Sequence, residues 1–183
     1  MIMIIILTIV GFITITAATA AAAPLTTTIS TFTSAFTQYQ DFVAELTSEM
    51  VVPPVKSNAT GVVYFQLAKK DNMIDYSLIV RDFDDAEAAH IHIGKEGEKN
   101  DTVIVTLYKP FKAPRLLGRI LSVDDDITSD TLEGPLTGKQ LSDLVNFMNN
   151  RTAYVDIHSQ QYPNGELRGQ ISKRPSIGSW IWE

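Results

Sequence analysis

The sequence contains no cysteine, so any fold it adopts lacks disulfide bonds and any metal site must use imidazole and oxygen ligands. Basic residues are few and come late, since no lysine or arginine precedes Lys56. The formal net charge is -6 and the pI is near 5.0. This balance argues against nucleic-acid binding, which normally requires a basic patch.

Common catalytic motifs are also missing. The sequence has no G-x-S-x-G elbow, no P-loop and no H-E-x-x-H pair. Two acidic runs, Asp82–Asp85 and Asp124–Asp126, lack the spacing of a calcium-binding EF-hand and are interpreted as solvated loops. Hydrophobic residues nevertheless make up 45% of the chain, which is a globular composition.

The N-terminal segment has the pattern of an export signal. Met1–Ile15 is almost wholly apolar, and Ala17–Ala23 supplies the small residues that a signal peptidase needs. We expect a signal peptide over residues 1–23, which makes the protein secreted or displayed at the cell surface. The alternative is retention of the segment as a membrane anchor.

The remaining chain divides into three parts. Residues 24–37 form a Thr-rich linker, residues 38–173 form the folded domain, and residues 174–183 form a tail with two tryptophans, Trp180 and Trp182. The tail is either a covering strand or a partner-binding end. Three N-x-T sequences predict glycosylation acceptors at Asn58, Asn100 and Asn150.

Alternation of apolar and polar residues predicts an all-β fold, an antiparallel β-sandwich or barrel. A single helical pattern, over Thr137–Asn149, predicts one short helix with Thr137 as its N-cap. The expected strands are 41–48, 60–68, 73–81, 88–93, 102–107, 116–123, 153–158 and 166–172.

All three histidines of the chain lie in two of these strands. Residues two apart on a strand share one face, so His90 and His92 point together away from the apolar Ile91. In the second strand, His158 shares its polar face with Asp156. If the two strands are neighbours, three imidazoles converge on one point. Nitrogen and oxygen donors in this pattern favour Cu(II) or Zn(II).

Further polar residues surround this pattern. Asp156 or Glu166 is predicted to orient a ligating imidazole from outside the coordination sphere, and Arg168 lies on the same polar face. The competing interpretation is a purely structural network, in which Arg168 pairs with Glu166 or Asp156 and the histidines bond to carboxylates. Both interpretations stay open at the level of sequence.

Four ordered segments carry a family resemblance. They are Val52-Pro53-Pro54-Val55 with Gly61, then Ala89-His90-Ile91-His92-Ile93-Gly94, then Tyr154-Val155-Asp156-Ile157-His158, and last Tyr162-Pro163-Asn164-Gly165-Glu166-Leu167-Arg168-Gly169-Gln170. In this order they resemble the CHRD domain family, named for its repeats in chordin, over about residues 38–173. The resemblance implies an immunoglobulin-like or superoxide-dismutase-like β-barrel, exported, with no established enzymatic activity.

Three functions are consistent with these observations. The first is a non-enzymatic extracellular binding module that holds a metal ion through His90, His92 and His158. The second is a superoxide-dismutase-like metalloenzyme, which would need an open coordination position. The third is a structural cell-surface protein without metal, whose contacts with an extracellular protein partner are made by strand edges or the tail.

Overall fold

The computed structural model describes residues 39–68, 72–110, 115–116 and 119–174. The predicted leader, the Thr-rich linker and the two tryptophans of the tail lie outside the described residues. Within this part of the chain, no helix is long and apolar enough to span a membrane.

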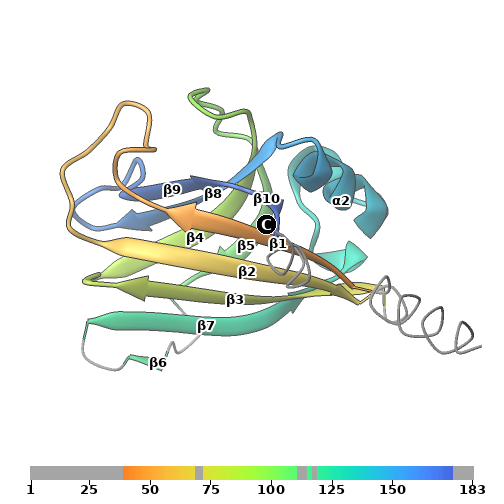
Figure 1. Ribbon diagram of the computed structural model, residues 1–183, viewed down its shortest axis with the longest axis horizontal. Helices are drawn as coiled ribbons and strands as arrows, with labels where there is room; N and C mark the ends of the chain where they lie inside the picture. The colour runs from red at the N-terminus through yellow and green to blue at the C-terminus, as the bar shows by residue number, and fades with distance from the viewer. Residues whose placement is uncertain (1–38, 69–71, 111–114, 117–118, 175–183) are drawn as a thin grey trace, which may run out of the picture.

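Two antiparallel sheets make up most of the domain, which confirms the all-β prediction (Figure 1). The six-stranded sheet has the order β10-β1-β2-β3-β7-β6, and the four-stranded sheet has the order β5-β4-β8-β9. The strands are β1 (Tyr39–Leu46), β2 (Thr60–Ala68), β3 (Met73–Arg81), β4 (Ala86–Ile93), β5 (Val103–Tyr108), β6 (Arg115–Leu116), β7 (Ile120–Ile127), β8 (Ala153–Ser159), β9 (Leu167–Gln170) and β10 (Ser172–Lys173).

The core lies between the two sheets. The six-stranded sheet contributes side chains such as Phe42, Phe65 and Leu78, all essentially inaccessible to solvent. The four-stranded sheet contributes Ile91 and Ile157 from the apolar positions of its alternating strands. Tyr76 of β3 donates a hydrogen bond of 2.5 Å to the carbonyl of Leu107 on β5, which ties the two sheets together across the core.

One helix, α2 (Leu141–Asn149), accompanies the strands and lies beside one end of the sandwich (Figure 1). Its apolar side buries Leu141, Leu144, Val145 and Met148, as the helical spacing predicted. Its start differs from the prediction, because the N-cap is Gln140 rather than Thr137. Gly138 adopts a positive φ of 73°, which turns the chain after Thr137, and a reciprocal Gln140–Asp143 capping box then begins the helix. Two short 3-10 turns, η1 (Ser129–Thr131) and η2 (Gly134–Leu136), precede it.

Two strand predictions need correction. The expected strand 116–123 is two strands, and the second continues through Asp124–Asp126. These residues pair with β3, so the acidic run is part of the sheet and not a loop. The expected strand 166–172 is also divided: β9 pairs with β8, whereas β10 pairs with β1 in the other sheet.

The two sheets come together at the edge where the chain passes from β9 to β10. Just beyond the end of β1, Thr47 exchanges two backbone hydrogen bonds of 3.0 Å with Arg168 of β9. The contact is close because Gly169 has no side chain: a Cβ there would lie 2.1 Å from the carbonyl oxygen of Glu45. The four-stranded sheet is therefore held against β1 at the strand that carries Arg168.

Candidate metal centre

The register between β4 and β8 gathers the polar residues predicted from the sequence. His90 lies opposite Asp156, His92 opposite Tyr154, and Ala88 opposite His158. Directly paired residues of antiparallel strands project to the same side, so the histidines of β4 and the polar residues of β8 share the face turned away from the core. The two strands that carry the histidines are therefore neighbours, as the predicted convergence of the imidazoles requires.

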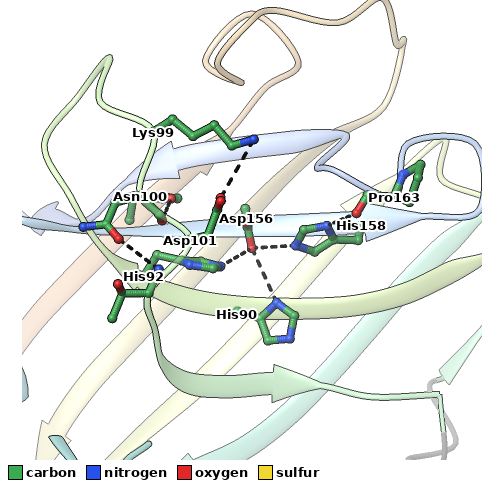
Figure 2. A network of polar contacts seen from close by, with 10 residues as sticks. His90, His92, Lys99, Asn100, Asp101, Asp156, His158 and Pro163 are labelled. Carbon is green, nitrogen blue, oxygen red and sulfur yellow. Dashed lines mark hydrogen bonds and ion pairs between the residues drawn. The ribbon is translucent and has the colours of Figure 1, made fainter. Parts of the chain in front are cut away.

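Asp156 stands at the centre of this cluster (Figure 2). Its Oδ1 lies 3.1 Å from His92 Nε2, 3.1 Å from His158 Nε2 and 3.7 Å from His90 Nδ1. The four ligand atoms all lie within 4.8 Å of one another. Ligands of a tetrahedral ion with bonds near 2.0–2.1 Å are about 3.3 Å apart. The distances from Asp156 to His92 and His158 are close to this value, whereas the longer separations within the group would have to shorten around an ion.

The polar face is covered rather than open to solvent. The side chain of His92 is 6% exposed, that of Asp156 13%, and that of His90 20%. Loop residues surround Asp156, among them Asp101 between β4 and β5 and Asn164 between β8 and β9. Tyr154 also donates a hydrogen bond to the carbonyl of Asn100 in the first of these loops. Strand alternation fixes the direction in which these side chains point, but it carries no information about what covers them.

The hydrogen bonds of His158 determine which of its nitrogens carries the proton. Nδ1 lies 2.9 Å from the carbonyl oxygen of Pro163, which can only accept, so Nδ1 is the protonated nitrogen (Figure 2). In the neutral ring, Nε2 therefore presents a lone pair towards the Asp156 carboxylate. Two acceptors facing each other at 3.1 Å require a cation or a proton between them.

The electrostatics of the cluster agree with this requirement. Burial raises the pKa of Asp156, but its contacts with His158, His90 and His92 lower that pKa by more, so the net shift is well below the usual range. Burial lowers the pKa of His158, while the bond to Asp156, its charge and the Pro163 carbonyl raise that pKa to a net increase. Asp156 is thus ionised and attracts positive charge to its neighbours.

Several imidazole nitrogens here are left without a hydrogen bond. Among the described residues, His90 Nδ1, His92 Nδ1 and His158 Nε2 are buried and form none. Two of these three atoms face the Asp156 oxygen. Buried polar atoms without partners are uncommon and costly in folded proteins. Together with Asp156, these residues form a group whose ligand atoms could hold a metal ion.

Glu166 and Arg168 have other partners. The Glu166 carboxylate accepts hydrogen bonds from Ser57 Oγ, at 2.6 Å, and from Ser159 Oγ. The guanidinium of Arg168 lies 3.6 Å from the centre of the Tyr154 ring and donates to the carbonyl of Lys95. Neither pairs with Asp156 or with an imidazole within the described structure. Asp156, predicted to orient an imidazole from outside the coordination sphere, lies among the residues that could themselves hold a metal ion.

Tyr154 is the residue of this site that the sequence argument did not single out. Its ring stacks on that of His92, with centres 5.2 Å apart and planes at 11°. Burial raises its pKa, as expected for a phenol enclosed between two other side chains. The one available signal was its alternation with Asp156 and His158 along β8.

Comparison with known proteins identifies the family. The model of the CHRD domain matches residues 42–171, which include both strands of the candidate centre. No curated protein and no solved structure matches the chain. With most of its length, and all of its candidate ligands, inside the matched region, the chain belongs to the CHRD domain family.

Proposed function

We propose that this CHRD domain is an exported binding module that holds one Cu(II) or Zn(II) ion through His90, His92, His158 and Asp156. One observation carries the proposal: a fixed His158 tautomer turns the lone pair of Nε2 towards an ionised carboxylate oxygen 3.1 Å away. A divalent cation between them satisfies both acceptors at once, together with the other two imidazoles.

The donor set restricts the choice of ion. Three imidazole nitrogens and one carboxylate oxygen suit Zn(II) and Cu(II), whereas Ca(II) and Mg(II) prefer oxygen ligands throughout. Four protein ligands also fill a tetrahedral coordination sphere. Catalytic zinc sites usually keep one position open for water or substrate, while structural sites are closed. The arrangement therefore favours a binding or stabilising role over catalysis.

A superoxide-dismutase-like activity is the competing function. It would require an open position on a redox-active ion. We expect copper-loaded protein to show no superoxide dismutation above that of the same amount of free copper. If the copper-loaded protein dismutes superoxide above this level and His90→Gln abolishes the activity, an enzymatic role replaces the proposed binding role.

Metal titration tests the proposal directly. Isothermal titration of the purified protein with Zn(II) is expected to give one site with a dissociation constant below about 1 µM. His158→Gln and Asp156→Asn should each weaken binding at least about tenfold, since each removes a ligand. Asp126→Asn is the matched control, because it removes an exposed carboxylate from the other sheet. If the protein does not bind Zn(II), or if all variants bind it equally, the metal proposal is wrong and the cluster is a structural network of imidazolium and carboxylate groups.

The histidines supply an independent measurement. Because the chain has only three, every imidazole resonance in an NMR spectrum reports on this site. Zn(II) should shift all three sets of resonances at a ratio of one ion per chain. A shift in only one or two would reduce the ligand set accordingly.

Export is the second part of the proposal and depends on residues 1–23 acting as a cleaved signal. Two of the three predicted glycosylation acceptors, Asn58 and Asn150, are exposed, while Asn100 uses its side-chain oxygen to accept a bond from Thr102. N-terminal sequencing of protein recovered from the medium is expected to begin near residue 24. Recovery only in the membrane fraction, with Met1 retained, would show an anchor instead. A pull-down from medium with the metal-loaded domain would identify an extracellular protein partner.

A further inference from the structure

We infer that Tyr154 is a positioning residue for the metal ligand His92, and that it acts by joining this ligand to the loop that covers the site. The inference rests on the proposed function, since it concerns how the same centre is held ready for its ion. The loop in question begins two residues after His92 and runs over residues 94–102 between β4 and β5.

The histidines are not held in the same way. His158 has a hydrogen bond from Nδ1 to the Pro163 carbonyl, which fixes both its tautomer and the plane of its ring. His92 lacks an equivalent bond, because its Nδ1 is buried and forms no hydrogen bond with the described residues. Metal-bound histidines usually have such a partner. At His92 the flat contact with Tyr154 takes its place.

Tyr154 is itself fixed from two further directions. Its hydroxyl donates a 2.5 Å hydrogen bond to the carbonyl of Asn100, and the guanidinium of Arg168 lies 3.6 Å from the centre of its ring. Because β8 lies between β4 and β9, His92 and Arg168 approach the ring from opposite sides. Tyr154 and Arg168 are both buried, at 3% and 4% exposure. The three side chains therefore form a stack, in the order His92, Tyr154, Arg168. A ring held on both faces and at its tip has little freedom to rotate.

This stack also fastens the covering loop. The hydroxyl of Tyr154 contacts the loop at Asn100, and Arg168 donates to the carbonyl of Lys95 at 3.0 Å. One end of the stack is thus the proposed ligand His92, while Tyr154 in the middle and Arg168 at the other end each hold the loop at one point. Removing the middle ring should loosen both, so that His92 samples other rotamers and must be reordered when the ion binds.

Two variants separate the contributions of the Tyr154 ring and of its hydroxyl. Tyr154→Leu removes the flat contact with His92, and we expect Zn(II) affinity to fall about 10- to 100-fold, the usual cost of losing an outer partner of a ligand. Tyr154→Phe retains the ring against His92 but loses the hydrogen bond to Asn100, while Arg168 still holds the loop, so its Zn(II) affinity should fall less, by about threefold. The Cu(II) electron paramagnetic resonance spectrum should change in Tyr154→Leu and remain unchanged in Tyr154→Phe.

The control is Phe65→Leu, an equivalent loss of a buried ring from β2 in the other sheet. It should lower the melting temperature without changing Zn(II) affinity or the Cu(II) spectrum. The inference is overturned if the unmodified protein binds metal and Tyr154→Leu binds as tightly with the same spectrum. It is also overturned if Phe65→Leu weakens binding equally, since the effect would then be general destabilisation. If the unmodified protein binds no metal, the proposed function fails together with the inference.

Discussion

Replacing Gly169 by alanine tests the close contact between the two sheets. The new Cβ would lie 2.1 Å from the carbonyl oxygen of Glu45 and 2.8 Å from Leu46 Cδ2, whereas real Cβ contacts are essentially never under 3.0 Å. The obstacle is backbone, so it cannot rotate away as a flexible side chain would. We expect β9 and β1 to separate locally by about 1 Å.

The cost can be estimated from what the separation disrupts. Overpacking of a buried position costs about 1–3 kcal/mol. The two hydrogen bonds between Thr47 and Arg168, both 3.0 Å long, lie next to Gly169 and contribute about 0.5–1.5 kcal/mol each. Together these effects predict a loss of about 2–6 kcal/mol, against a typical total stability of about 5–15 kcal/mol. Because Arg168 adjoins the substituted residue, Zn(II) affinity should fall as well.

Urea denaturation followed by circular dichroism measures this loss. The control is Gly97→Ala, since a Cβ at Gly97 meets no atom within 4 Å. That glycine has a positive φ of 78°, so its replacement should still cost about 1 kcal/mol. A loss in Gly169→Ala no greater than in Gly97→Ala would refute the steric argument and the importance of this contact for closing the sandwich.

Further predictions concern the core, the helix and the ion. Tyr76→Phe should cost about 1–3 kcal/mol in urea denaturation, because the buried Leu107 carbonyl loses its donor. Burial, with a smaller contribution from Asp126, raises the pKa of Tyr76 from 10.0 to about 12. A raised folded-state pKa lowers stability as pH rises, so the unmodified protein should lose stability from about pH 10 to about 12, and Tyr76→Phe should lack this component. Asp143→Ala should cost about 1 kcal/mol of thermal stability through loss of the capping box that begins α2. Zn(II) affinity should fall as the pH is lowered, because protons compete with the ion for the imidazoles, and the raised pKa of His158 makes this competition begin at a higher pH than for a free imidazole. A pH-independent titration would contradict histidine ligation.

Alternation along single strands was sufficient to predict much of the candidate site. It placed His90 and His92 on one side of their strand and Asp156 and His158 on one side of theirs, and the structure agrees. The pairing of these strands was not predictable in the same way. Residues 90 and 156 are far apart in the chain, and their register depends on packing of the whole sandwich rather than on local pattern.

The incorrect predictions have local causes. Asp124 and Asp126 are exposed on the outer side of β7, while Val123 and Ile127 are buried. Three consecutive aspartates conceal this alternation, because Asp125 occupies a position on the same side as Val123 and Ile127. The run therefore has the composition of a loop although it forms a strand. Likewise, the alternation from Glu166 to Ser172 is continuous in sequence, and only the backbone bonds show that the chain changes sheets near Ile171.

The segment from Glu166 to Gln170 has two structural roles, which alternate along it. Leu167 is fully buried in the core, and Gly169 admits the backbone of β1. The intervening residues turn the other way and hold loops: Glu166 accepts from Ser57, Arg168 donates to Lys95, and Gln170 donates to Gly94. One side of this short segment therefore closes the sandwich, and the opposite side holds the loops around the candidate metal centre. A change on the core side of β9 should therefore weaken metal binding without touching a ligand. A change on its outer side should weaken metal binding by releasing the covering loop, and it should also cost stability because Arg168 and Gln170 are buried.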